Sequence, residues 1–221
     1  MNSATIPTPS EIRAGLAAMP AQTVPAMRVL RREWSRRAAT SPPHVMLELA
    51  ERLAPAGAWE RLVAYELVAN HPGAMKALTP RRLRVLGRGM DSWEMVDAFS
   101  CYLAGPAWRD GQVPDSVVQA WCRSEDRWWR RAALACTTAL NIPARGGKGD
   151  AERTLAICTL LLDDRDDMVV KAMSWALRAL ARQDPRSVKA FVAKHAEELA
   201  PRVKREVNTK ITTGRKTAKK T

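Results

Sequence analysis

The chain has 221 residues, of which 46% are hydrophobic and 27% charged, a balance typical of one globular domain and unlike that of a disordered chain. Lys and Arg outnumber Asp and Glu by 36 to 23, so the formal net charge is +13 at pH 7. This excess of positive charge favours a partner with dense negative charge, most often nucleic acid.

The sequence also lacks the features of a membrane-spanning protein and of a secreted protein. No stretch approaches the roughly 18 apolar residues that a membrane span needs, and residues 1–10 have neither the basic start nor the apolar run of a signal peptide. We therefore expect a cytoplasmic protein with no membrane partner, associated with the nucleoid when it is bound to DNA. We also expect a monomer, because a stack of helical repeats closes its own core.

The four cysteines lie 21, 14 and 22 residues apart, without a CxxC pair. This spacing disfavours a zinc site. Each cysteine lies in an apolar helical context, where a free thiol behaves as a small hydrophobic group. We therefore expect buried thiols, no metal and no cofactor. The four residues are Cys101, Cys122, Cys136 and Cys158.

Apolar residues recur about every 3.6 positions along most of the chain, and no window shows the strict alternation of a half-buried strand. The sequence therefore predicts an all-α fold, with short connections that favour antiparallel neighbours. In chain order, the expected helices are 10–19, 24–39, 43–53, 58–70, 80–88, 93–104, 116–123, 125–140, 151–162, 167–182, 185–195 and 201–211.

Two segments point to a repeat. Residues 125–133 and 164–172 each have an acidic turn, then an apolar position, then a basic residue followed by alanine. This pattern, at a period near forty residues, is typical of HEAT-type repeats. It predicts helical hairpins stacked into a curved superhelical solenoid with a basic concave face, forming a single domain over residues 1–211.

Two segments stand outside the helical pattern. The glycine-rich stretch 144–150 is expected to be a plain flexible linker. Residues 212–221 are polar and basic without apolar periodicity, and we expect them to be a disordered tail until they meet a polyanion. From residue 202 to the end, eight basic residues face Glu206 alone, which accounts for seven of the thirteen net positive charges.

Three predicted helices each place an indole within one turn of a charge, because residues three or four apart share a helix face. The sets are Trp93 with Asp97, Trp128 with Arg131, and Trp175 with Lys171 and Arg178. An indole face beside a carboxylate suits a cationic ligand, since the ring quadrupole attracts positive charge and the carboxylate adds a Coulombic attraction.

Five segments, taken in order, resemble the AlkD-type DNA alkylation repair family, bacterial DNA glycosylases built from HEAT-like repeats. Residues 24–28 are similar to its early P-x-x-R helix start, 93–97 to its tryptophan and aspartate helix, and 128–133 to its arginine helix. Residues 171–178 resemble its penultimate helix and 199–206 the start of its last helix. The chain departs from the family pattern at two positions: Ser92 stands where many members carry tryptophan, and Ala179 where an acidic residue is frequent.

The resemblance implies a monofunctional glycosylase that removes positively charged alkylated bases from duplex DNA: 3-methyladenine, 7-methylguanine and bulkier N3 or N7 adducts. It implies that Asp97 is the catalytic carboxylate, Arg131 its partner, and Trp93 and Trp175 the active-site indoles. It also implies contacts with the DNA backbone that leave the base stacked. Further residues expected to contact the lesion or the DNA are Trp128, Lys171, Arg178 and Arg28.

The residues suggest how such a site works. A cationic base is already a good leaving group, so the barrier lies in the oxocarbenium character that develops on the sugar. An ionised Asp97 opposes that charge, and we expect a close Arg131 to lower the pKa of Asp97. No histidine is needed as an acid, and no lysine is placed for a lyase step.

Two alternatives remain at this level. The protein is a non-catalytic HEAT-repeat scaffold for nucleic acid or protein if Asp97 and Arg131 form only an interhelical ion pair. Within the enzymatic interpretation, the substrate range is either small methyl lesions or the adducts of one bulky genotoxic natural product. The remaining indoles are expected to pack in the core or at its edge. They are Trp34, Trp59, Trp108, Trp121 and Trp129.

Overall fold

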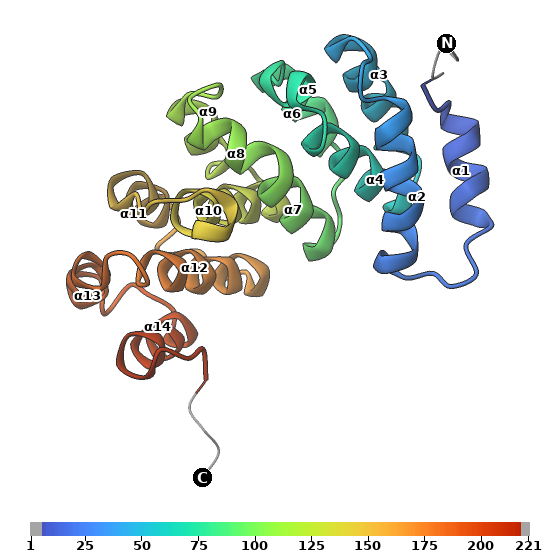
Figure 1. Ribbon diagram of the computed structural model, residues 1–221. Helices are drawn as coiled ribbons and strands as arrows, with labels where there is room; N and C mark the ends of the chain where they lie inside the picture. Colours follow the sequence, from blue (N-terminus) through green and yellow to red (C-terminus); the bar gives the residue numbers. More distant parts are fainter. Residues whose placement is uncertain (1–5, 218–221) are drawn as a thin grey trace. The chain divides into compact units, whose positions relative to one another are not determined.

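The computed structural model describes residues 6–217, and in that range every regular element is a helix (Figure 1). The all-α prediction is confirmed. The elements are α1 Pro9–Ala17, α2 Val24–Arg37, α3 Pro43–Leu53, α4 Ala58–Ala69, α5 Pro72–Lys76, α6 Pro80–Gly87, α7 Trp93–Phe99, η1 Ser100–Ala104, α8 Gly105–Arg109, α9 Asp115–Trp121, α10 Arg127–Asn141, η2 Pro143–Arg145, α11 Ala151–Leu160, α12 Asp167–Leu180, α13 Pro185–Lys194 and α14 Pro201–Thr213.

The helices form two compact units, residues 1–90 and residues 91–221. The assignment of residues 1–211 to one domain stays a prediction beside this division, as does the superhelical curvature. Among the described residues, none of the helices has the length and apolar character required to cross a bilayer. All four cysteines are free and buried, as expected from their apolar settings.

Capping side chains fix several helix starts. The hydroxyl of Thr79 accepts from the backbone N–H of Arg82 at 3.3 Å, and the carboxylate of Asp184 accepts from that of Ser187 at 2.9 Å. A proline follows each cap directly, where its missing N–H costs nothing. These signals are local, so the sequence alone is enough to place them. The predicted starts of α6 and α13 are confirmed.

Helix α5 was not predicted. It spans five residues, and hydrophobic periodicity is read over windows of about 11 to 18 residues. Its cap is also unusual, because the Nδ1 atom of His71 accepts from the backbone N–H of Ala74 at 3.0 Å. A histidine cap is not among the residue types that announce a helix start.

The helix predicted over residues 93–104 ends too early. The helical path continues from α7 through the π-turn η1 into α8, which ends at Arg109, despite Pro106. A proline ring collides with the carbonyl four residues earlier in a regular α-helix. Here the backbone N–H of Gly105 donates to the carbonyl of Ser100, five residues back, which widens the turn. Glycine is also required by packing, since a Cβ at residue 105 would lie 2.6 Å from the Ser100 carbonyl oxygen and 2.8 Å from the Cβ of Ala139.

Gly105→Ala is therefore expected to destabilise the protein by about 1–3 kcal/mol, the range for overpacking a tight core. The added methyl meets backbone and a short side chain, neither of which can rotate away. Urea denaturation followed by circular dichroism measures the change. A free energy of unfolding within about 0.5 kcal/mol of the wild-type value, the usual scatter of neutral surface changes, would contradict this account of the crossing.

In the unit of residues 91–221, α7, α10, α12 and α14 pack side by side in that order (Figure 1). Helix α11 lies in the connection from α10 to α12, and α13 lies in the connection from α12 to α14. The two predicted acidic turns mark the starts of α10 and α12. Asp126 and Asp166, forty residues apart, each accept from the backbone N–H two residues later at 2.8 Å. Arg130 joins the two turns through an ion pair with Asp164 at 2.7 Å.

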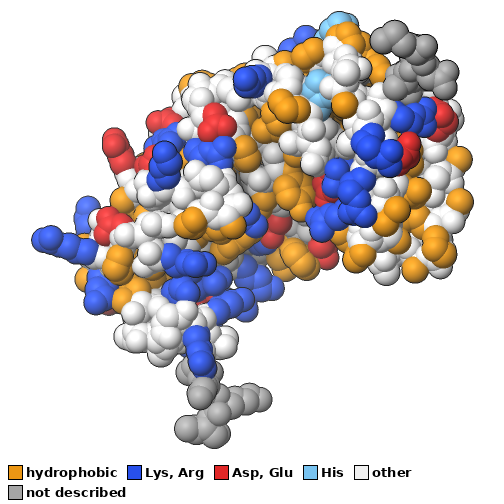
Figure 2. Space-filling view, viewed as in Figure 1, with side chains coloured by type: hydrophobic (Ala, Val, Ile, Leu, Met, Phe, Trp, Pro, Cys, Tyr) orange, Lys and Arg blue, Asp and Glu red, His pale blue; other side chains and the backbone are white. Residues whose placement is uncertain are grey.

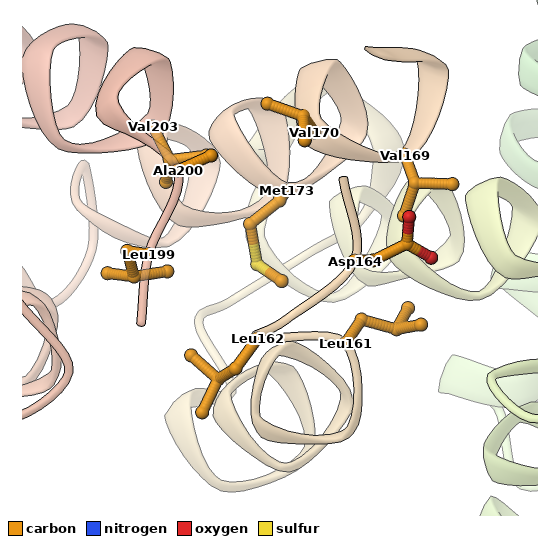
Figure 3. Close-up of a pocket in the computed structure, with 9 residues that line it drawn as sticks. All are labelled: Leu161, Leu162, Asp164, Val169, Val170, Met173, Leu199, Ala200 and Val203. Carbon is orange, nitrogen blue, oxygen red and sulfur yellow. The ribbon is translucent and has the colours of Figure 1, made fainter. Parts of the chain in front are cut away.

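The seam between α11, α12 and α14 is apolar and almost filled (Figure 3). Its space of about 10 Å³ holds one water molecule at most. This crevice is therefore a packing seam that holds α12 in place. Its lining residues are Leu161, Leu162, Asp164, Val169, Val170, Met173, Leu199, Ala200 and Val203.

In the unit of residues 1–90, a buried arginine binds the carbonyl groups at the end of α6. Arg61, on α4, donates to the backbone carbonyls of Leu86, Arg88 and Gly89 at 3.0–3.3 Å. Those carbonyls lie at or beyond the end of α6 and have no partner within the helix. The guanidinium thereby fixes α6 against α4.

The last helix ends later than predicted. Helix α14 runs to Thr213, two residues past the expected boundary, and Gly214 caps it with a φ of +70°. A left-handed glycine is a common helix terminator. Residues 215–217 follow it, while residues 218–221 of the predicted tail lie outside the described residues. The disorder of the tail stays a prediction.

Candidate active site

An open cavity of about 480 Å³ lies in the unit of residues 91–221. Its size falls within the range of small-molecule sites. Six of the eight predicted site residues are among those lining it. The lining residues are Trp93, Asp97, Arg131, Met168, Lys171, Trp175, Arg178, Arg202 and Lys216.

The carboxylate of Asp97 is held by Arg131 through two parallel hydrogen bonds. Nε of Arg131 donates to Oδ1 at 3.0 Å and Nη2 donates to Oδ2 at 2.9 Å. The third donor, Nη1, reaches the backbone carbonyl of Met168 on α12 at 2.6 Å. These bonds from one guanidinium join α7, α10 and α12, and they are shielded from water because Arg131 is only 5% exposed. A bidentate pair of this kind fixes the plane of the carboxylate as well as its position.

The expected pKa of Asp97 needs a correction. Burial raises the pKa of Asp97 above its ordinary value and outweighs Arg131, which lowers it by hydrogen bonding and by charge. The sequence shows the neighbouring arginine but not the depth at which the pair sits. The carboxylate therefore gains a proton at a higher pH than an exposed aspartate does.

Two indoles line the cavity from different helices. Trp93 is the first residue of α7 and is 50% exposed, an unusual exposure for so large an apolar side chain. Trp175 lies in the middle of α12 and is half-buried. Asp97 is one turn after Trp93 on the same helix, so the exposed indole and the carboxylate share one face of α7.

Basic side chains form the rest of the lining, and Figure 2 shows Lys and Arg side chains gathered over α12 and α14. Lys171 pairs with Asp167 at 2.6 Å. Arg178 donates to the hydroxyl of Ser174 at 3.1 Å, and that hydroxyl donates to Glu206 on α14 at 2.7 Å. Arg202 and Lys216 were expected only as part of the basic end of the chain, and α14 and the residues after it bring them to the same cavity.

Two predicted site residues are not assembled here. Trp128 is the second residue of α10, its ring lies 4.8 Å from the guanidinium carbon of Arg127, and it is not one of the lining residues. Arg28 belongs to the unit of residues 1–90, where its Nε donates to the buried carboxylate of Glu66 at 2.7 Å. Their contacts with DNA stay predictions.

The glycine-rich stretch is not the open linker that was expected. Its backbone bonds back to the end of α10: the N–H groups of Gly147 and Gly149 donate to the carbonyls of Ile142 and Leu140, each at 3.0 Å. A Cβ at residue 147 would lie 2.6 Å from the backbone of α10, so glycine is needed for this approach. The expectation of a plain linker was wrong because these glycines serve packing.

This loop carries Arg145, which was not among the predicted site residues. Its guanidinium carbon lies 5.3 Å from the ring centre of Trp175. Arg145 also lowers the pKa of Asp97 by its charge, after burial and Arg131. Among the residues the structure describes, no three His, Cys, Asp or Glu side chains gather as a metal site would require.

Residues 20–211 match the model of a family described as DNA alkylation repair enzyme. No curated protein and no solved structure matched the chain. The family match spans most of the chain, including every residue of the cavity except Lys216. The chain belongs to the DNA alkylation repair enzyme family.

Proposed function

We propose that the protein is a monofunctional DNA glycosylase that hydrolyses the N-glycosidic bond of positively charged alkylated bases in duplex DNA. Family membership supports a role in alkylation repair. The observation that carries the finer proposal is the carboxylate of Asp97, fixed at both oxygens by Arg131, in a cavity that Trp93 and Trp175 also line.

Asp97 suits the chemistry of a charged leaving group. An N3- or N7-alkylated purine becomes neutral when the bond to C1′ breaks, so the developing positive charge is on the sugar. A fixed carboxylate stabilises that charge and orients the attacking water, without rearranging during the reaction. Arg131 supports this role by holding both oxygens and by opposing protonation of a buried acid.

The remaining lining suits a nucleotide within duplex DNA. The indoles of Trp93 and Trp175 offer flat faces for a cationic base and its sugar. Arg178, Arg202 and Lys216 supply positive charge for neighbouring phosphates. Lys171 is paired with Asp167 at 2.6 Å, so we expect no Schiff base with the sugar and no lyase step. The cavity is open, which suits a base that stays stacked and an adduct that projects from the helix.

Incubation of the purified protein with methylated duplex DNA, followed by chromatography for free 3-methyladenine and 7-methylguanine, tests the proposal. Release above the spontaneous rate supports a glycosylase. Tight binding of the same DNA without release identifies a scaffold instead, with Asp97 and Arg131 as an interhelical ion pair.

The basic end of the chain is expected to add to DNA affinity. A chain that ends at Gly214 keeps α14 with its cap and lacks four cations, namely Arg215, Lys216, Lys219 and Lys220. We expect weaker binding to undamaged duplex and a log–log salt slope smaller by about two to four, because each neutralised phosphate contributes close to one unit. A fluorescence-anisotropy titration at several salt concentrations measures the slope.

Replacing the four cations with glutamine in the full-length chain separates charge from chain length. This variant should reproduce the reduced slope. An unchanged slope in both proteins would show that the end of the chain does not contact DNA.

A further inference from the structure

Arg145 occupies a defined place between two helices of the candidate site. Its Nη1 donates to the hydroxyl oxygen of Thr138 on α10 at 2.8 Å. That hydroxyl is buried and donates its proton to the carbonyl of Ala135 at 2.7 Å, so its oxygen is the acceptor for Arg145 and for the thiol of Cys101, whose Sγ lies 3.8 Å away. The backbone carbonyl of Arg145 accepts from Nη1 of Arg109. Both ends of the residue are therefore anchored.

The anchored guanidinium lies over the ring of Trp175, with its carbon 5.3 Å from the ring centre. Trp175 lines the cavity, whereas Arg145 is not among the described residues that do. The guanidinium therefore contacts the indole without forming part of the cavity lining. A stacked guanidinium restricts the rotation of the ring, because the contact is lost when the ring turns.

Arg145 also acts on the charge of the site. Like Arg131, it lowers the pKa of Asp97 by its charge, while Glu94 raises that pKa. The same guanidinium lowers the pKa of the neighbouring Cys101, which burial raises. The charged or titratable groups around Asp97 are Glu94 on α7, Cys101 on η1, Arg131 on α10, Arg145 on η2, Lys171 and Arg178 on α12, and Arg202 and Lys216 from α14 and the residues after it.

We propose that Arg145 is a positioning residue of this site, which fixes the indole of Trp175 against the cavity and supplies a second positive charge to the carboxylate of Asp97. This assignment rests on the proposed glycosylase function only in its effect on rate. The two roles come from one side chain because the guanidinium lies over the ring of Trp175 and shares the hydroxyl of Thr138 with Cys101, which follows Asp97 by one helical turn.

Three variants separate these roles. Arg145→Met removes the charge and the planar group, and Arg145→Lys keeps the charge but loses the planar group. Lys148→Met is the matched control, since it removes one cation from an exposed position in the same loop. The measurement is the single-turnover excision rate of 7-methylguanine from a duplex, with protein in excess, as a function of pH and after subtraction of spontaneous depurination.

Arg145→Met is expected to move the acid limb of the rate profile to higher pH, because the Asp97 carboxylate loses one stabilising charge. Its plateau rate is expected to fall about three- to tenfold, as loss of a partly buried cation–π contact implies. Arg145→Lys should restore the acid limb to its wild-type position while the plateau stays low. Lys148→Met should change neither.

A titration of the Asp97 side-chain carboxyl by ¹³C NMR, on protein without DNA, gives the electrostatic result independently of catalysis. A higher midpoint in Arg145→Met than in the wild type supports the proposal, and an unchanged midpoint overturns it. If the midpoint shifts but the wild-type protein releases no base, the proposed function fails while the coupling of Arg145 to Asp97 stands. Thermal melting of each variant verifies folding, and Arg145→Lys carries the plateau test if the Met variant is unfolded.

Discussion

Asp97→Asn is expected to lower the single-turnover excision rate of 7-methylguanine by about 10²–10³-fold, the usual cost of losing one preorganised electrostatic group. The amide keeps the shape of the carboxylate but not the charge that opposes the oxocarbenium ion. Asn also presents an NH₂ group to a guanidinium that has only donors, so one of the two bonds from Arg131 is lost. We expect nearly unchanged affinity for undamaged duplex.

Glu94→Gln is the matched control for this change. Glu94 lies on the same helix, is exposed and also bears a negative charge near Asp97. Its loss should leave the rate within about threefold of the wild type, since a screened surface charge contributes little. An Asp97→Asn rate within the same range would remove Asp97 from the chemistry.

The second large effect concerns the choice of lesion. If the site stabilises only a charged leaving group, the protein should excise 3-methyladenine and 7-methylguanine and leave uracil and 1,N6-ethenoadenine in place. A neutral base needs a proton to leave, and no histidine lines the cavity among the described residues. Single-turnover reactions on oligonucleotides with one defined lesion measure this selectivity. Robust release of uracil by the wild-type protein would overturn the mechanism.

Trp175→Ala is expected to reduce excision of the cationic lesions by about one to two orders of magnitude, as loss of a desolvated cation–π contact of about 2 kcal/mol implies. The same change frees the guanidinium of Arg145, which the indole covers. Trp59→Ala is the control, because that half-buried indole does not line the cavity and is not among the predicted DNA contacts. Equal losses in the two variants would show that the effect is one of stability and not of the site.

The centre of the site was predictable because its signals are local or belong to the family pattern. Trp93 and Asp97 lie one turn apart on one helix, and the resemblance supplied Arg131 and Trp175 from two others. The acidic turns at Asp126 and Asp166 also located the starts of two helices: α12 begins at the predicted residue, and α10 begins two residues later than predicted. Spacing along a helix is enough to decide such features.

What the sequence did not reveal depends on depth and on tertiary packing. The direction of the pKa shift of Asp97 follows from burial, which outweighs the arginine that the sequence places beside it. Arg145 was missed because a stretch rich in glycine resembles a linker, whereas Gly147 is there to let the backbone meet α10. The helical continuation through Pro106 was missed because the π-turn that accommodates it depends on the crossing with α10.

Hydrolysis at a charged base is tested most directly by counting all the products of one reaction. A duplex with a single 7-methylguanine is mixed with excess protein, and free base, abasic sites and strand breaks are counted in the same samples. We predict one abasic site for each base released, with the strand intact and with release lost in Asp97→Asn. Binding of this duplex without free base above the spontaneous rate would contradict the assignment of the cavity as a glycosylase site.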